Sequence, residues 1–202
     1  MVKVLSVCVC LLTAAVRPTS LPAQFSGSIV YENEYQTLAG ETLYFAVKPK
    51  SWFYVQGNNL KVYDRHKELQ ELYLGATNAY YRIKKGKVVP AAKATPPASV
   101  ATFRCLPTTA TILGHSCQML QLVQDGTSTL IFYSPELRVN AADFSRCPSP
   151  GWAKLLQATD GGLPLRTITV DTRRDIVATS EAIEIQARSL AADEFSLTAP
   201  AR

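Results

Sequence analysis

The side chains best suited to chemistry lie together in one short stretch. Gly114-His115-Ser116-Cys117-Gln118 holds a histidine, a serine and a cysteine, the residue types used in nucleophilic catalysis. The stretch lacks the second glycine of a nucleophile elbow and lies between two extended runs, whereas the elbow needs a strand-to-helix turn. His115 and Cys117 share a strand face, so a Cys/His pair or half a metal site is conceivable. Because His66 is the other histidine of the chain, we interpret the pair as a disulfide cysteine beside a surface histidine.

The acidic residues give no stronger indication of a reaction. Glu68 and Glu71 stand beside basic residues, as solvated charges do, and Asp160 and Asp171 lie at turns, where aspartate bonds to the backbone. The sequence has no glycine loop for phosphate and no series of spaced metal ligands. We therefore expect a protein that is not an enzyme and uses no cofactor or metal, with a hydrolase built around His115 as the least favoured reading.

The start of the chain has the three parts of a secretory signal peptide. Lys3 gives a basic start, residues 4–16 form an apolar run, and small residues and prolines follow up to Ala23. The run is too short to span a bilayer as a stable helix. We expect a signal peptide at residues 1–23 and one exported domain at residues 24–202, periplasmic or extracellular and not membrane-spanning.

Loss of the leader changes the cysteine count. It removes Cys8 and Cys10 and leaves Cys105, Cys117 and Cys147, an odd number in an exported chain. One disulfide and one remaining thiol, or a thiol shared between chains, would account for three cysteines, and three pairings are open. We favour Cys117 with Cys147, since the first lies on a strand and the second in a proline-rich loop that otherwise has little to hold it.

Alternating residues and turn signals predict a mainly β structure. Asp125-Gly126 separates two extended runs and predicts a hairpin with a type I′ turn. Further runs give eight to ten antiparallel strands, with Arg65 to Leu74 open to either helix or strand and Ser134-Pro135 ending a strand. Ser149-Pro150 predicts the capped start of one short helix. The proline- and alanine-rich residues 88–99 predict an exposed, mobile loop.

Basic and aromatic residues are concentrated in the first half of the domain. From Lys48 to Arg104 there are eleven Lys or Arg against three acids, although the net charge of +5 falls to about +3 when Lys3 and Arg17 leave with the leader. A basic sheet attracts nucleic acid or anionic lipid head groups, or it simply has lysines on its wet face. In an exported protein we expect no nucleic acid partner.

The aromatic set offers two readings. Its members are Tyr44, Phe45, Trp52, Phe53, Tyr54, Tyr63, Tyr80 and Tyr81. Neighbours such as Phe53 and Tyr54 point to opposite faces of a strand. Either both faces are covered as core, or one face forms an apolar hollow that binds a ligand. For the second case, Trp52 and Tyr54 are our predicted inward, ligand-binding residues.

Three short motifs give the chain a family resemblance. Ile112-Leu113-Gly114-His115-Ser116-Cys117, Tyr133-Ser134-Pro135-Glu136-Leu137 and Gly162-Leu163-Pro164-Leu165 resemble segments of secreted proteins related to the GLPGLI group. Leu165 stands where that group has its second motif glycine, so the chain is more similar to a sister family. The resemblance implies a LolA/LolB-like half barrel, a single curled antiparallel sheet with one short helix near its mouth. It implies no catalytic residue.

These observations together predict a non-enzymatic envelope protein. We expect it to bind a lipid or another hydrophobic or amphiphilic molecule in the concave face of the sheet. The alternative is a structural or protein-interaction module of the cell envelope. A carrier should have a hollow, whereas an interaction module should have a filled interior and a patch outside. Neither the ligand nor the oligomeric state follows from the sequence.

Overall fold

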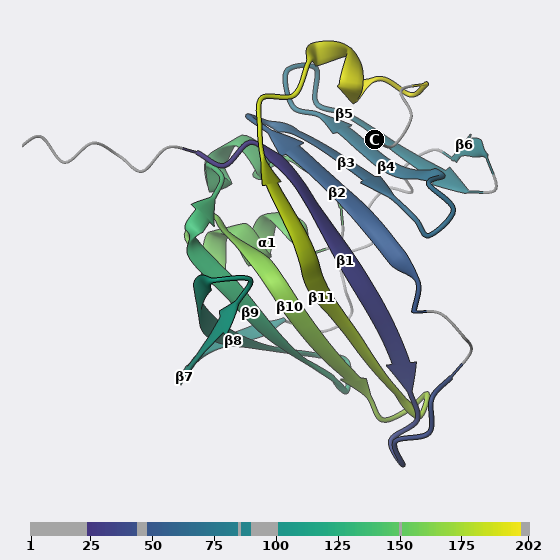
Figure 1. Cartoon of the computed structure of the whole chain (residues 1–202), viewed down its shortest axis with the longest axis vertical. Helices are drawn as coiled ribbons and strands as arrows, with labels where there is room; N and C mark the ends of the chain where they lie inside the picture. Colours follow the sequence, from purple (N-terminus) through teal and green to yellow (C-terminus); the bar gives the residue numbers. More distant parts are fainter. Residues whose placement is uncertain (1–23, 44–47, 85, 90–100, 150, 199–202) are drawn as a thin grey trace, which may run out of the picture.

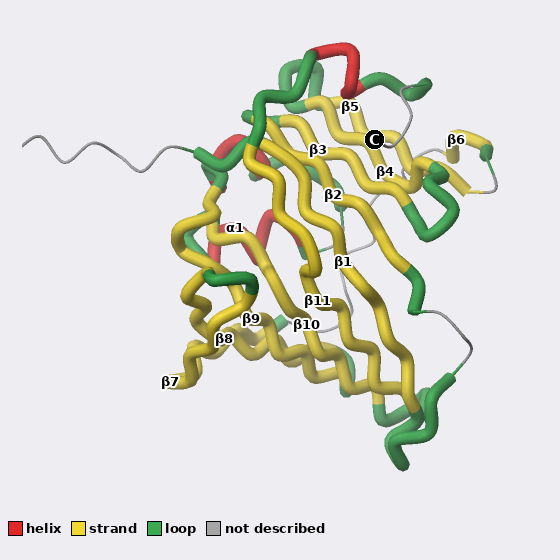
Figure 2. The backbone as a smooth tube through the Cα atoms, viewed as in Figure 1, coloured by secondary structure: helices red, strands yellow, loops and turns green. Residues whose placement is uncertain are grey.

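One antiparallel sheet of eleven strands, open at its two edges, organises the chain (Figures 1 and 2). The structure, a computed structural model, describes residues 24–43, 48–84, 86–89, 101–149 and 151–198. The expected signal peptide at residues 1–23 lies outside the described residues. So does most of the predicted 88–99 loop, of which Val88 and Val89 belong to an edge strand.

The strands follow the chain with one exception. They are β1 (Gly27–Gln36), β2 (Lys50–Gln56), β3 (Asn59–Tyr63), β4 (Leu69–Leu74), β5 (Ala79–Lys84), β6 (Lys87–Val89), β7 (Thr102–Ile112), β8 (His115–Gln124), β9 (Thr127–Arg138), β10 (Gly162–Asp171) and β11 (Ile176–Ala187). Their spatial order is β6-β5-β4-β3-β2-β1-β11-β10-β9-β8-β7. Each half of the chain is therefore a meander, and the pairing of β1 with β11 joins the two halves into one sheet.

The Asp125-Gly126 hairpin is confirmed. Asp125 and Gly126 have φ angles of 50° and 75°, as a type I′ turn requires, and Gln124 pairs with Thr127 across it. The hairpin lies near one edge of the sheet, because the pairing of β1 with β11 occupies the centre. The prediction that Ser134-Pro135 ends the strand was wrong. The ladder between β9 and β10 is irregular beyond Ser134, and an irregular ladder accommodates a proline.

Residues Arg65 to Leu74, left open between helix and strand, form a turn followed by β4. The predicted helix is present as α1 (Trp152–Ala158), and short 3₁₀ segments form η1 (Ala141–Phe144) and η2 (Ala192–Phe195). Ser149 does not cap α1, because its hydroxyl donates to the Glu71 carboxylate at 2.9 Å. The helix follows Gly151 instead, whose φ of 77° favours glycine.

Gly161 ends the helical segment. Its amide donates to the carbonyl of Leu156 at 2.7 Å, and its φ is 82°. A Cβ at this position would lie 2.0 Å from the carbonyl oxygen of Val139, so a larger residue would displace the backbone. The glycine therefore lets α1 return tightly against the strands.

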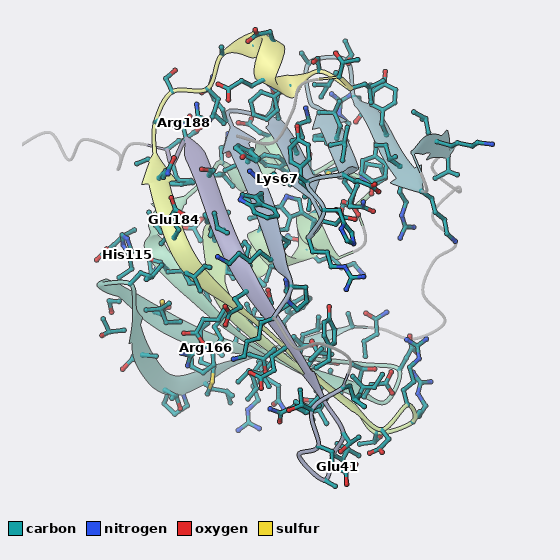
Figure 3. All side chains as sticks on the ribbon, turned by 45° about the vertical axis from the view of Figure 1, so that its right-hand side comes forward. Glu41, Lys67, His115, Arg166, Glu184 and Arg188 are labelled. Atoms are coloured by element: carbon teal, nitrogen blue, oxygen red, sulfur yellow. The ribbon has the colours of Figure 1, made fainter. Side chains whose placement is uncertain are left out.

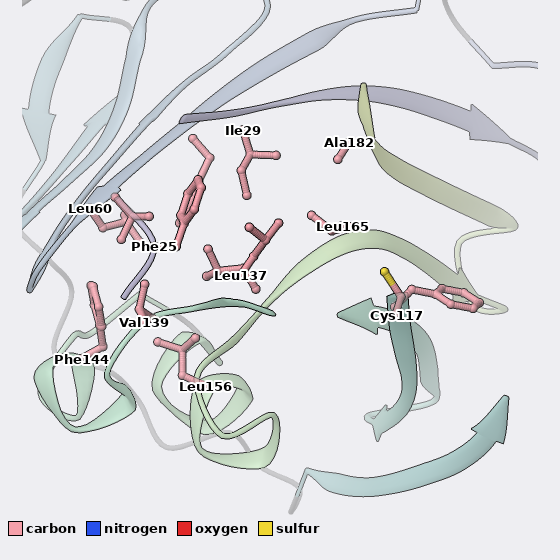
Figure 4. Packing of buried hydrophobic residues seen from close by; sticks show 14 of the residues in the cluster. Phe25, Ile29, Leu60, Cys117, Leu137, Val139, Phe144, Leu156, Leu165 and Ala182 are labelled. Carbon is pink, nitrogen blue, oxygen red and sulfur yellow. The ribbon is translucent and has the colours of Figure 1, made fainter. Parts of the chain in front are cut away.

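The sheet curls around η1 and α1 and fills that side with one large core (Figure 4). The face that carries Ile29, Phe53 and Tyr73 is called the helix-side face here. Phe53 meets the ring of Trp152 at 5.3 Å between centroids, and Tyr73 meets Phe144 at 6.1 Å. The deepest part of the concavity is thus occupied by the protein's own side chains.

The opposite, outer face of β2 to β4 is covered by the end of the chain. Residues 188–198, the C-terminal strap, place Leu190 and Phe195 over Tyr54, Tyr63 and Leu72. Arg188 and Glu194 form a two-bond ion pair within the strap, with nitrogen–oxygen distances of 3.0 and 2.8 Å. Side chains of β2 to β4 are therefore buried on both faces, which accounts for the many aromatic residues of these strands.

Cys105, Cys117 and Cys147 are free thiols in the structure, and the predicted Cys117–Cys147 disulfide is absent. Cys117 lies on β8, where its thiol approaches the carbonyl of His115 at 3.6 Å. Cys147 follows η1, and its amide donates to the carbonyl of Phe144. The loop needs no covalent tie, because Phe144 and Cys147 are themselves buried in the core.

Candidate functional site

A cleft of about 630 Å³ lies on one side of the central strands. Its wall is mainly apolar, and it is lined by residues from β1, from β2 and the residue before it, and from the turn after β3: Asn33, Tyr35, Pro49, Lys50, Ser51, Asp64 and Arg65. The volume lies in the range of small-molecule sites, roughly 300 to 1,000 Å³. We refer to these residues as the β1–β2 cleft.

The cleft forms where bulky side chains give way to small polar ones. Ile29 and Phe53 are cross-strand partners on the helix-side face, and both are buried. Two positions further along, Tyr31 pairs with Ser51, and Asn33 follows on the same face. Asn33 and Ser51 are small polar residues on a face that carries Ile29 and Phe53 further along the strands, so space remains above the strands beside them.

Asn33 holds the floor of the cleft in place. Its backbone amide and its side-chain Nδ2 both donate to the carbonyl of Pro49, at 2.8 and 3.1 Å. Nδ2 also lies 3.3 Å from the Ser51 hydroxyl. These bonds cross the connection between β1 and β2 and leave the amide oxygen of Asn33 and the Ser51 hydroxyl as groups that a ligand can address.

The charged side chains at the rim have different roles. The Asp64 carboxylate accepts from the amides of His66 and Glu68 at 2.9 and 3.0 Å, so it organises the turn between β3 and β4. Arg65 Nε donates to Nε2 of His66 at 2.8 Å. Lys50 is exposed. The rim therefore carries more positive than negative charge that a bound molecule can meet.

The structure does not place the two predicted ligand-binding residues in the concavity. Phe53 takes the helix-side face, so Trp52 and Tyr54 lie on the outer face. Tyr54 is 5% exposed and packs edge-on against Tyr63 at 5.7 Å, while Lys67 stands 5.3 Å from the Trp52 ring centre. The predicted alternation along β2 was correct, but the assignment of its faces was wrong, because the sequence does not show which face receives the helices.

His115 does find a polar partner. Its Nδ1 lies 3.3 Å from the Glu136 carboxylate at the outer end of the β7–β8 hairpin. Cys117, on the next inward position of the strand, is fully buried, and burial raises the pKa of its thiol. His66 belongs to the turn between β3 and β4, whereas His115 begins β8, and the neighbouring Lys67 lies apart from His115 in Figure 3. The geometry is that of a half-exposed histidine–carboxylate pair beside an inert thiol.

Among the described residues, no group of three or more His, Cys, Asp or Glu side chains is placed to hold a metal ion. No helix within the described part of the chain is long and apolar enough to cross a membrane.

Sequence reasoning missed the β1–β2 cleft. In the sequence, residues 48–50 indicate only a break between two strands, although Pro49 and Lys50 line the cleft. One available signal was the change along β1 from Ile29 and Tyr31 to Asn33, a polar residue on the face that is apolar elsewhere. A polar residue at this position indicates a cleft only once the pairing of β1 with β2 is known.

Comparison with known proteins bears on the fold. No protein-family model matches the sequence, and no curated protein matches it either. Among solved structures, PNGF-II overlaps 84% of this chain with a TM-score of 0.50 at 14% identity. The chain spans only 30% of the length of PNGF-II. The curled sheet therefore recurs there as one part of a larger protein.

Two further structures align over most of both chains, with lower overlap. A DUF1329 family protein from Desulfovibrio piger has a TM-score of 0.36 and 9% identity, and the alignment covers 85% of this chain and 90% of that one. A putative outer membrane lipoprotein-sorting protein domain from Vibrio parahaemolyticus has a TM-score of 0.30 and 10% identity, and the alignment covers 84% of this chain and 89% of that one. Overlap at this level carries no argument about the activity of the chain.

Proposed function

We propose that the protein is an exported, non-enzymatic binding protein that holds an amphiphilic molecule in the β1–β2 cleft. The observation that carries the proposal is the cleft itself, which joins a mainly apolar wall to a polar floor and a basic rim. The export step of the proposal is supported by the three-part pattern of residues 1–23.

The lining selects the class of ligand. Tyr35 is 37% exposed and presents an aromatic ring, and Pro49 adds an apolar surface without a donor. Ser51 and the Asn33 amide offer hydrogen bonds at the floor, and Lys50 offers a positive charge at the rim. A molecule with an apolar body and a polar or anionic end would satisfy these groups together, because leaving either kind of surface unmatched costs free energy.

A binding role accounts for the carboxylate and histidine geometry better than a reaction does. Asp64, the carboxylate of the cleft, is already engaged by two backbone amides. The His115–Glu136 pair lies outside the cleft lining. We therefore assign no catalytic residue.

Filling the cleft tests the proposal. Protein purified from its own host would be compared by native mass spectrometry before and after denaturation, for the unaltered chain and for Ser51→Trp. Ser128→Trp is the matched control, since Ser128 is also half-buried but lies on β9, away from the cleft. We expect a bound mass of roughly a few hundred daltons, as suits a ligand of this volume, in the unaltered chain and in the control.

Ser51→Trp should lose that mass and keep its far-UV circular dichroism. A bare mass in the unaltered chain, or the same bound mass in Ser51→Trp, would contradict the proposal.

A structural or protein-interaction module is the second candidate, and one observation favours it. The concavity beneath η1 and α1 is filled by the core that contains Phe53, Tyr73 and Phe144. A filled interior is what an interaction module needs. If native mass spectrometry showed the unaltered chain without a bound ligand, the interaction module would become the favoured function.

A further inference from the structure

The side-chain amide of Asn33 is held in one orientation in the β1–β2 cleft. Its Nδ2 donates to the carbonyl of Pro49 at 3.1 Å and lies 3.3 Å from the Ser51 hydroxyl. A carbonyl oxygen only accepts hydrogen bonds, so a flipped amide would set two oxygens against each other. Both hydrogens of the Asn33 amide are therefore used inside the protein, and its oxygen remains as an acceptor.

The Ser51 hydroxyl completes the floor of the cleft. Its oxygen accepts from Asn33 Nδ2, so its own proton is directed elsewhere. Among the described residues, no hydrogen bond uses that proton or the Oδ1 atom of Asn33. Both residues line the cleft, on the face that carries Ile29 and Phe53. The floor therefore presents one acceptor and one donor next to each other.

The floor carries no formal charge. Lys50, next to Ser51 in β2, pairs with Glu32 across the ladder, so its charge belongs to the rim and has a carboxylate beside it. A ligand group that reaches the floor meets the neutral Asn33–Ser51 pair instead. The hydrogen-bonding pattern of that pair, rather than a charge, decides which group fits.

We propose that the polar end of the bound amphiphile is an uncharged group that both donates and accepts a hydrogen bond, as a hydroxyl or a carboxamide does. The inference rests on the proposed function, because it concerns the molecule held in the cleft. Such a group donates to the Asn33 oxygen and accepts from the Ser51 hydroxyl. A carboxylate or an ester has acceptors only, so it displaces water from the Asn33 oxygen without replacing the hydrogen bond.

Four ligands with matched alkyl chains test the inference: decanol, decanamide, decanoate and methyl decanoate. Their affinities for the full chain, as its host processes it, would be measured by isothermal titration calorimetry at neutral pH. Decanol and decanamide should bind about ten-fold more tightly than the other two, because an acceptor left without a donor costs roughly that factor. Methyl decanoate separates the missing donor from the charge of decanoate.

Asn33→Ala removes the acceptor from the floor and leaves the Ser51 hydroxyl. The preference for decanol over methyl decanoate should then disappear, whereas a purely structural role of Asn33 would weaken the binding of both ligands equally. The matched control is Asn140→Ala, at an exposed position that caps η1 outside the cleft lining, and it should keep the preference. Far-UV circular dichroism checks that both variants fold.

Three results would overturn the inference and leave the proposed function standing: equal affinity of the unaltered chain for decanol and methyl decanoate, tighter binding of decanoate than of decanol, or an unchanged preference in Asn33→Ala. The first two come from the unaltered chain and do not depend on any variant. If none of the four ligands binds, the proposed function fails together with the inference.

Discussion

Lys61 ties the C-terminal strap to the outer face of the sheet, and its replacement by methionine gives a test of that anchor. The side chain is only 1% exposed, and its Nζ donates to the backbone carbonyls of Glu194, at 3.0 Å, and Ser196. The Tyr63 ring centre lies 5.0 Å from the same nitrogen. Lys61→Met keeps most of the buried stem and removes the donor.

At pH 7 the variant should be less stable by about 1 to 3 kcal/mol, because two carbonyls lose a donor that carries charge. Burial lowers the pKa of Lys61 from 10.5 to about 8, partly opposed by Glu194. Between these two values the unfolded state binds more protons than the folded state, so the Lys61 contribution to stability rises with pH. The neutral amine still has two N–H donors for the two carbonyls.

Between pH 7 and about pH 9.5, titration of Lys61 should raise the free energy of unfolding of the unaltered chain by about 2 kcal/mol. Lys61→Met lacks the titrating group, so the stability difference between the two proteins should widen by that amount. Other groups that titrate at high pH, such as Tyr63, whose pKa burial raises to about 12, are present in both proteins and largely cancel.

Equilibrium urea unfolding, followed by far-UV circular dichroism at both pH values, measures the difference. Lys154→Met, at an exposed position of α1, is the control and should change stability by no more than about 0.5 kcal/mol at either pH. A stability difference for Lys61→Met that stays constant or narrows as the pH rises would refute the reasoning.

Two further predictions concern the core and the thiols. Phe144→Ala should lower the free energy of unfolding by about 3 to 5 kcal/mol, because Phe144 is fully buried against Tyr73 and Trp152. Urea unfolding measures this loss. A loss below about 1 kcal/mol would mean that the η1 segment does not pack tightly against the core. In the natively folded protein, a thiol reagent should label Cys105, which is exposed, and leave Cys117 and Cys147 unlabelled until denaturant is added, since both are buried and burial raises the pKa of Cys147 to about 11. Peptide mass spectrometry assigns the labelled site, and a reducible, disulfide-linked Cys117–Cys147 peptide pair should not appear after oxidative purification; its detection would contradict the structure.

The sequence by itself determined most of the local structure. The φ angles needed at Asp125 and Gly126 depend on two adjacent residues, so the hairpin was predictable. The same holds for the alternation along β2, which depends on neighbours in the chain. The curled antiparallel sheet with one short helix also agrees with the expectation from the family resemblance.

Only the tertiary structure decided which faces are buried, and by what. The alternation of Trp52, Phe53 and Tyr54 is symmetric with respect to the two faces, and the choice between them is made by α1 and the C-terminal strap, which are distant in sequence. The β1–β2 cleft depends in the same way on the pairing of β1 with β2 and on the turn after β3.

The cysteines show the same limit, because a disulfide depends on distance in space, whereas only an odd number of cysteines and a proline-rich loop can be read from the chain. Strand periodicity is a local property of the backbone, but a site is a set of distances between segments, and those distances are fixed when the sheet closes around its core.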